Sequence, residues 1–258
     1  MPALVTVFHS WLNQRLNRWC NFREINMIKL RRSDDRGRIR LNWLDSRHTF
    51  SFVDYHDPQQ MGFSNLRVIN EDRVIPGAGF GTHSHRDMEI IPYVLEGALA
   101  HRDSTGASLS ISVGEVQRMS AGTGINHSEY NASQTEPVHF LQIWIIPEHT
   151  GLKPEYEQRD FALDNNRGRF ILVASKQGRD NSVTVDQDVD VWAARFASGE
   201  QLAFRLGPGR HGFIQAARGA ATLNGITLVA GDGAAVDQEE ILEFRALEDA
   251  EMLLFDLA

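Results

Sequence analysis

Cysteine is almost absent from this chain, which has Cys20 and no other cysteine among its 258 residues. A single thiol can form no disulfide within the chain and cannot build a cysteine-based zinc site. Long apolar runs are missing as well, and no stretch approaches the length of about 18 residues that a membrane-spanning helix needs. We therefore expect a protein of the reducing cytoplasm that does not enter a membrane.

An excess of positive charge is also missing. The chain carries 26 basic residues against 34 acidic ones, which gives a formal net charge of −8. Proteins that bind the phosphates of DNA or RNA need clustered cations, so direct nucleic-acid binding is not expected. The composition, 42% hydrophobic and 23% charged, is typical of a globular protein.

The first 26 residues differ from the rest of the chain. Their arginines are opposed by a single acid, Glu24, and their apolar residues recur at roughly helical spacing. A secretory signal is not expected, because a continuous apolar run and a small-residue cleavage site are missing. We interpret residues 1–26 as an N-terminal extension, either a loosely attached helix or the product of an upstream start codon. A targeting peptide is the less favoured alternative.

From Met27 onward, the pattern is of short strands separated by Gly, Pro, Asn and Asp. Apolar and polar residues alternate in Thr49–Val53 and in Leu109–Val113. Phe140–Ile146 is a continuous apolar run, as expected of a strand buried on both faces. Many short strands at regular spacing predict an all-β sandwich or barrel.

The two halves of the chain resemble each other. Tyr93–Gly97 and Gln215–Gly219 are each followed by a segment that ends in a glycine and an acidic residue. A repeat of this length predicts two duplicated barrels rather than a solenoid. We place a first domain at residues 27–160 and a second domain at residues 161–258.

Four residues in the first half have the spacing of metal ligands. His83 and His85 end one glycine-rich segment, and His127 and Glu129 end another. Side chains two positions apart on a strand point to the same face, so the two pairs converge if their strands face each other across a barrel. Three imidazoles and one carboxylate suit one divalent transition metal, with Fe(II) as our first choice and Mn, Co, Ni, Cu or Zn as alternatives. Such a set leaves coordination positions open, as in a catalytic site.

Glu89 is a second candidate for the carboxylate ligand. It has the same alternation phase as His83 and His85, so the strand rule alone does not decide between Glu89 and Glu129. The other role open to Glu89 is to accept a hydrogen bond from a ligand imidazole and orient it.

The glycine-rich segments also carry a family resemblance. Residues 77–97 resemble the first cupin motif and residues 114–127 resemble the second. The finer resemblance is to the pirin family and runs from Met27 to about Leu257. It rests on Trp43–Phe52, Met61–Phe63, Met119–Ile125 and His127–Asn131. It implies two tandem cupin barrels, also called double-stranded β-helix or jelly-roll domains.

The resemblance implies that Glu129, rather than Glu89, is the carboxylate ligand. The chain departs from the general cupin pattern in two places. One residue more than the usual spacing separates Glu89 from Gly97, and Ser120 stands where many cupins have proline.

The second half is expected to hold no metal. Aligning the two halves on their shared glycines places Arg205, Gly207, Phe244 and Ala246 opposite the four candidate ligands. None of these side chains is a good ligand for the metals considered, so we predict one metal per chain.

The pirin resemblance implies a flavonol 2,3-dioxygenase that uses O₂ to cleave a small aromatic substrate such as quercetin. Glu129 would be the general base, and Phe80, Met119 and Phe140 are expected to line the pocket. The alternative is a metal-containing regulator of the pirin type that binds a protein partner. The remaining histidines with no partner spacing are expected at the surface or in hydrogen bonds: His48, His56, His101, His139 and His149.

Overall fold

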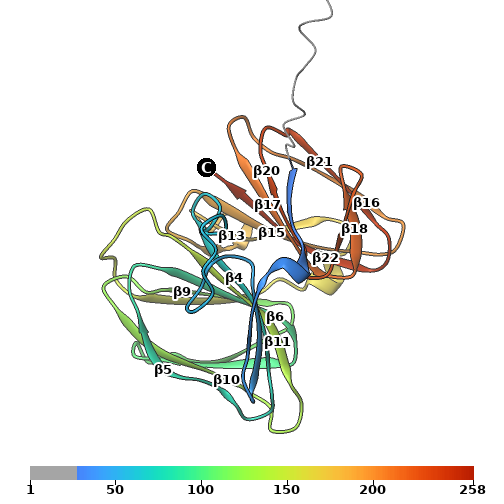
Figure 1. Cartoon of the computed structure of the whole chain (residues 1–258). Coiled ribbons are helices and arrows are strands. Elements are labelled where there is room, and N and C mark those ends of the chain that lie inside the picture. The colour runs from blue at the N-terminus through green and yellow to red at the C-terminus, as the bar shows by residue number, and fades with distance from the viewer. Residues whose placement is uncertain (1–27) are drawn as a thin grey trace, which may run out of the picture.

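The computed structural model describes residues 28–258, so the extension predicted for residues 1–26 lies outside the described part. Strands β1 to β22 and three short 3-10 helices make up the secondary structure there, and Figure 1 shows two barrels. The 3-10 helices are Ser33–Asp35, Leu163–Asn166 and Arg179–Asn181. The predicted all-β class and the two tandem cupin barrels are confirmed. Across residues 28–258, no helix is long and apolar enough to cross a membrane.

The N-terminal barrel is built from a seven-stranded and a four-stranded sheet. In spatial order the larger sheet contains β12 (Glu155–Asp160), β9 (Glu115–Ser120), β6 (Glu89–Glu96), β11 (Val138–Ile145), β4 (Leu66–Val74), β3 (Leu44–His48) and β2 (Gly37–Arg40). The smaller sheet contains β5 (Gly79–His85), β10 (Ile125–Asn131), β7 (Ala98–Asp103) and β8 (Ser108–Ser112).

The C-terminal barrel repeats this plan. Its larger sheet contains β1 (Ile28–Arg31), β20 (Gly233–Val236), β17 (His211–Arg218), β22 (Ala250–Leu257), β15 (Val189–Phe196), β13 (Phe170–Ser175) and β14 (Val183–Thr184). Its smaller sheet contains β16 (Gln201–Arg205), β21 (Ile241–Ala246), β18 (Ala220–Leu223) and β19 (Ile226–Val229).

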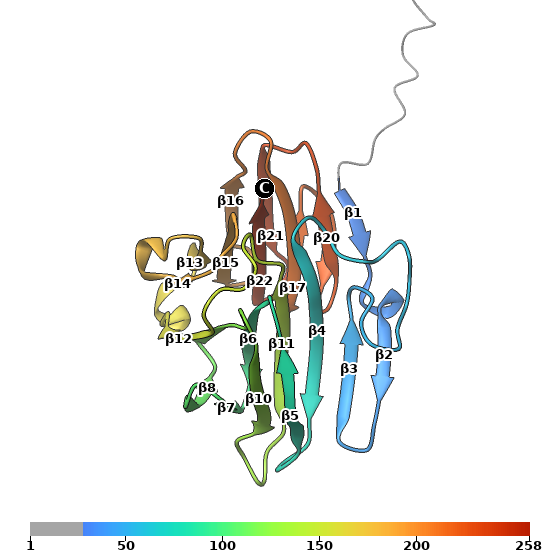
Figure 2. The same cartoon turned by 90° about the vertical axis from the view of Figure 1, so that its left-hand side faces the viewer.

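The chain passes between the barrels at two places. β1 pairs with β20, so the first described strand belongs to the sheet of the C-terminal barrel, as Figure 2 shows. β12 still pairs with β9, whereas β13 pairs with β15, so the later passage lies between Asp160 and Phe170. The domain boundary at residue 160 stays a prediction.

One apolar core lies between the two larger sheets. It joins Ile69, Leu141 and Ile143 of the N-terminal barrel to Phe213 and Phe255 of the C-terminal barrel. Burial of apolar side chains from both sides stabilises the association of the barrels, at roughly 25 cal/mol for each Å² removed from water.

Strands β4 and β11 therefore have two buried faces. Alternate residues of β11, such as Leu141 and Ile143, face the other barrel, whereas Gln142 and Trp144 line a cavity within their own barrel. This confirms the prediction of a doubly buried strand at Phe140–Ile146. The prediction of a strand at Thr49–Val53 is wrong. β3 ends at His48, and the chain then turns, with a positive φ of 48° at Val53.

The interiors of the two barrels differ. In the C-terminal barrel a single large cluster, including Phe196, Phe244 and Met252, fills the interior. In the N-terminal barrel the buried apolar residues form two smaller clusters, one around Phe140 and the other around Met119. Polar side chains and a cavity complete that interior.

Candidate metal centre

A bulge in β5 sets the direction of the candidate ligands. His83 and His127 are Cα partners in β5 and β10, but the next pair along the strands joins Phe80 to Glu129. Three residue steps along β5 thus match two along β10, as in a β-bulge. Because of the bulge, Phe80 and His83 both line the same cavity although they are three positions apart. Strict alternation does not predict this placement.

The three predicted histidines come together. One ring nitrogen from each of His83, His85 and His127 lies within 4.8 Å of the others. His83 Nδ1 lies 2.8 Å from the Gly81 carbonyl oxygen. A carbonyl only accepts, so Nδ1–H donates and His83 Nε2 keeps its lone pair. That nitrogen lies 3.0 Å from His127 Nε2.

This arrangement fits a divalent cation. The Nε2 atoms of His83 and His127, 3.0 Å apart, are close enough for both to bind one cation. Burial, with the neighbouring histidines, lowers the pKa of His85 to about 4 and that of His127 to about 3. Both rings are therefore neutral near pH 7, the form in which imidazole binds metals.

A carboxylate oxygen of Glu129 lies within 4.8 Å of ligand nitrogens of His127 and His101, but the group formed by His83, His85 and His127 does not include Glu129. The Gln142 amide donates a hydrogen bond of 2.7 Å to Glu129 Oε2, and Oε1 is buried with no hydrogen-bond partner. Burial and then the charge of Asp72 raise the pKa of Glu129 to about 8, against the effect of the Gln142 hydrogen bond. A cation near Oε1 would favour the ionised form.

Glu89, the alternative carboxylate, lies elsewhere. It accepts a hydrogen bond of 2.8 Å from Ser120, and Arg118 lies 4.0 Å away. Burial, opposed by the Ser120 hydrogen bond and the Arg118 charge, raises its pKa to about 7. Among residues 28–258, Glu89 lies in neither group of possible metal ligands, and its side chain bonds Ser120 rather than a ligand imidazole.

His101 is a site residue that sequence reasoning missed. It is buried and hydrogen-bonded, with Nε2 2.9 Å from Asp103 Oδ2, and its ring centroid lies 5.4 Å from that of His127. One ligand atom from each of His101, His127 and Glu129 lies within 4.8 Å of the others. The signal was available in the His-x-Asp alternation of β7, where His101 pairs with Glu129 and Asp103 with His127.

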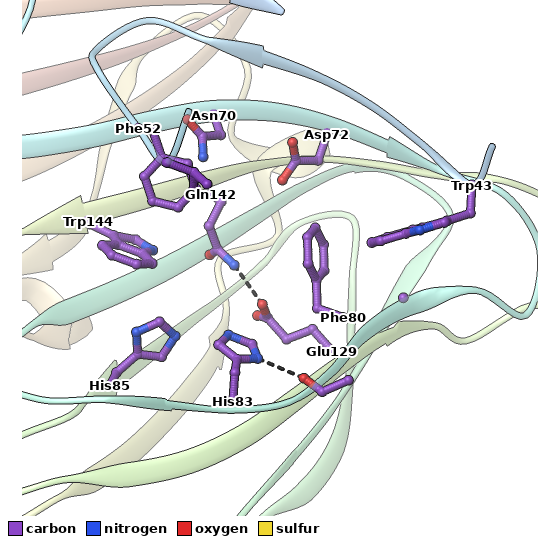
Figure 3. A pocket seen from close by; sticks show the side chains of 13 residues that line it. Trp43, Phe52, Asn70, Asp72, Phe80, His83, His85, Glu129, Gln142 and Trp144 are labelled. Atoms are coloured by element: carbon purple, nitrogen blue, oxygen red, sulfur yellow. Dashed lines mark hydrogen bonds between the residues drawn. The ribbon is translucent and has the colours of Figure 1, made fainter. Parts of the chain in front are cut away.

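The candidate metal centre opens onto a cavity of about 400 Å³. Figure 3 shows His83 and His85 along one side, aromatic rings at both ends, and polar side chains on the side opposite the histidines. The aromatic rings belong to Trp43, Phe52, Phe80 and Trp144. The prediction that Phe80 lines the pocket is confirmed. For Met119 and Phe140 it is wrong, because both are packed in the apolar clusters.

The positions of the second half that correspond to the ligands contain no comparable group. Phe244 and Ala246 are buried in the apolar core, and the Arg205 side chain is 72% exposed. Within residues 28–258, both groups of possible metal ligands belong to the N-terminal barrel.

Comparison with known proteins gives the family. The pirin family matches residues 29–145, and the family described as the quercetinase C-terminal cupin domain matches residues 172–257. A protein named quercetin 2,3-dioxygenase from Escherichia coli K12 is 48% identical over 231 residues, which is 90% of this chain and 99% of that protein. The chain belongs to the pirin family.

Further pirins extend this likeness. A pirin-like protein of Caulobacter vibrioides is 39% identical and covers 90% of this chain and 100% of its own length. The crystal structure of the E. coli pirin YhhW in complex with nickel(II) superposes with a TM-score of 0.85 and 47% identity, over 89% of this chain and 98% of that chain. That structure supports metal binding as a property of pirins close to this one.

Proposed function

We propose that this pirin is a metal-dependent dioxygenase that cleaves the heterocyclic ring of a flavonol such as quercetin with O₂. The observation that carries the proposal is that three kinds of side chain surround one cavity. A cluster of three histidines, a carboxyl oxygen without a hydrogen-bond partner, and aromatic end walls lie around the same space. Cavities of this size are suited to drug-sized ligands.

The proposed ligands of one divalent metal are His83, His85, His127 and Glu129. When bound, the cation would supply positive charge that stabilises the deprotonated 3-hydroxyl group of the substrate. Fe(II) remains our first choice, and the nickel complex of YhhW supports Ni(II) as an alternative for this chain. Zn, Cu, Mn and Co also suit the ligand set.

Glu129 has the position of the proton acceptor. Its Oε1 is buried without a hydrogen-bond partner while Gln142 fixes Oε2, so Oε1 is the oxygen that would take the proton of the substrate 3-hydroxyl. In the overall reaction two ring bonds break, both atoms of O₂ enter the product, and one ring carbon leaves as carbon monoxide. Trp144 and Phe80, at the two ends of the cavity, would hold the flat substrate and limit the entry of water.

Oxygen uptake with quercetin tests this function. Metal-loaded wild type should consume O₂, and Glu129→Gln should be slower by about 10²–10⁴-fold, the usual contribution of a general base. Glu89→Gln is the matched control, because Glu89 is a buried glutamate whose hydrogen bond goes to Ser120. Equal rates for wild type and Glu129→Gln would contradict the proposal.

The same assay separates the enzyme from the regulatory alternative. A regulator that works in the cytoplasm through a protein partner would hold the metal and show negligible uptake. Its partner binding would then differ between the ferrous and ferric protein.

A further inference from the structure

The cavity wall opposite the histidines is polar and comes from two neighbouring strands. β4 contributes Asn70 and Asp72, and β11 contributes Gln142 (Figure 3). Asn70 and Gln142 are Cα partners, and Asp72 follows on the same face of β4. The exposed fractions of Asn70, Asp72 and Gln142 are 3%, 3% and 8%.

Each of these side chains keeps an acceptor atom without a partner. Asn70 Oδ1, Asp72 Oδ1 and Gln142 Oε1 are all buried and make no hydrogen bond. Native proteins leave few buried polar atoms unsatisfied, and those that remain call for a ligand or water as the missing partner. Because all three atoms accept, the complementary group on a ligand is a hydrogen-bond donor.

Asp72 is the acidic member of the three and has no cationic partner among residues 28–258, in contrast to its neighbour Glu71. Glu71 faces the other side of β4 and is paired with Arg36 at 2.7 Å, His139 at 2.9 Å and Arg73 at 3.0 Å. Over residues 28–258, no such ion pair reaches Asp72, and burial raises its pKa to about 7 against a hydrogen bond from Ser46. The fold thus neutralises the carboxylate that faces the other barrel and leaves the one that faces the cavity without a cation.

We propose that Asp72, flanked by Asn70 and Gln142, accepts a hydrogen bond from a phenolic hydroxyl group on the part of the substrate that lies farthest from His83 and His85. This assignment rests on the proposed flavonol chemistry. It narrows the substrate class to planar aromatics that carry a second hydroxyl group away from the one held at the metal centre. Aromatics without that hydroxyl group leave the acceptors unpaired, and a site built to bind a hydroxyl group discriminates strongly against such analogues.

Binding measured without O₂ tests the assignment separately from catalysis. Quercetin and 3-hydroxyflavone share the 3-hydroxyl and 4-keto groups, but only quercetin has hydroxyl groups on the outer rings. Titration of the metal-loaded protein, followed by tryptophan quenching, should give wild type a preference for quercetin of about 10- to 100-fold, as for a hydrogen bond to a charged group. Asp72→Leu should reduce the preference to near unity, and Asp72→Asn, which keeps an acceptor oxygen, should give an intermediate value.

Thermal unfolding distinguishes substrate recognition from a structural role. Removing an uncompensated buried carboxyl should leave the melting temperature of Asp72→Asn unchanged or raised, because the fold loses an unfavourable group. Asp45→Asn is the matched control, since Asp45 is a half-exposed aspartate on the adjacent strand β3 that pairs with Arg38.

The two proposals fail in different ways. Equal wild-type affinity for both flavonols, an unchanged preference in Asp72→Leu, or a lower melting temperature in Asp72→Asn would overturn the role of Asp72, even if quercetin is cleaved. A preference that depends on Asp72 in a protein that consumes no O₂ would support the role of Asp72 and contradict the dioxygenase.

Discussion

Gln142 donates a hydrogen bond of 2.7 Å to Glu129 Oε2, and this leaves Glu129 Oε1 as the free oxygen. The two residues come from different sheets, because Gln142 lies on β11 and Glu129 on β10. The bond therefore ties the direction of the proposed carboxylate ligand to the opposite wall of the barrel.

Replacing Gln142 should weaken metal binding. Partners that orient a ligand typically contribute 10- to 100-fold to metal affinity, so Gln142→Leu should raise the dissociation constant by about that factor. Competition with a chromophoric chelator measures it. Gln201→Leu, at an exposed position on β16, is the control. An unchanged dissociation constant in Gln142→Leu would show that Glu129 needs no such support.

The close contact of Gly79 with β10 predicts a loss of stability on substitution. A Cβ at Gly79 would lie 2.3 Å from the Glu129 carbonyl oxygen, whereas a Cβ at Gly81 would find its nearest atom at 3.9 Å. Gly79→Ala should therefore push β5 away from β10 and lower the melting temperature well below that of Gly81→Ala. Similar melting temperatures for the two variants would contradict the observed strand pairing.

The Glu71 ion pairs predict an acid-dependent stability. Burial alone would raise the pKa of Glu71, but hydrogen bonds and charges from His139 and Arg36 hold it well below the usual range. The pKa of Glu71 is lower in the folded protein than in the unfolded chain, where it is about 4.3, so ionised Glu71 stabilises the fold above that pH. This stabilisation is lost as the pH falls. Glu71→Gln should cost about 3 kcal/mol at pH 7, because it leaves the buried Arg36 without an anionic partner. This difference in unfolding free energy should narrow progressively below about pH 5, and a difference that is constant with pH would refute the assignment.

A hydrogen bond between the barrels gives a fourth prediction. The buried Tyr93 of β6 donates to Glu251 of β22, which also pairs with Arg195 and Arg218. Tyr93→Phe should lower the free energy of unfolding by about 1–3 kcal/mol, the usual range for a hydrogen bond to a charged group. Urea denaturation measures it, with the 42% exposed Tyr130 changed to Phe as the control. An equal decrease in the free energy of unfolding in Tyr93→Phe and Tyr130→Phe would exclude this hydrogen bond as a source of stability.

The repeat and the strand pattern were enough to predict two all-β barrels, and the pirin resemblance supplied their cupin topology. Alternation at Leu109–Val113 and the apolar run at Phe140–Ile146 report directly which faces of a strand are buried, and both strands are present. Thr49–Val53 has the same alternation but forms a turn. Ser51 N–H donates to the Gln60 carbonyl there, and Phe52 and Tyr55 exchange backbone hydrogen bonds, so these contacts outweigh local preference.

The candidate site was predicted less completely. The spacing of His83 and His85 predicted that both side chains face the same side, because alternation holds within a single strand. The structure places both beside His127. The bulge that places Phe80 beside Glu129 depends on pairing between strands and leaves no spacing signal. Trp43, Phe52 and Asp72 reach the cavity from segments far away in the chain, so only the folded barrel reveals them.

Release of carbon monoxide from quercetin in the presence of O₂ tests the central claim most directly. Wild type and His83→Ala should be compared at known metal content per chain, with gas-phase detection of the product. We predict one carbon monoxide for each quercetin consumed by wild type and a loss of that release in His83→Ala. No carbon monoxide from fully metal-loaded wild type, or undiminished release from His83→Ala, would contradict the account.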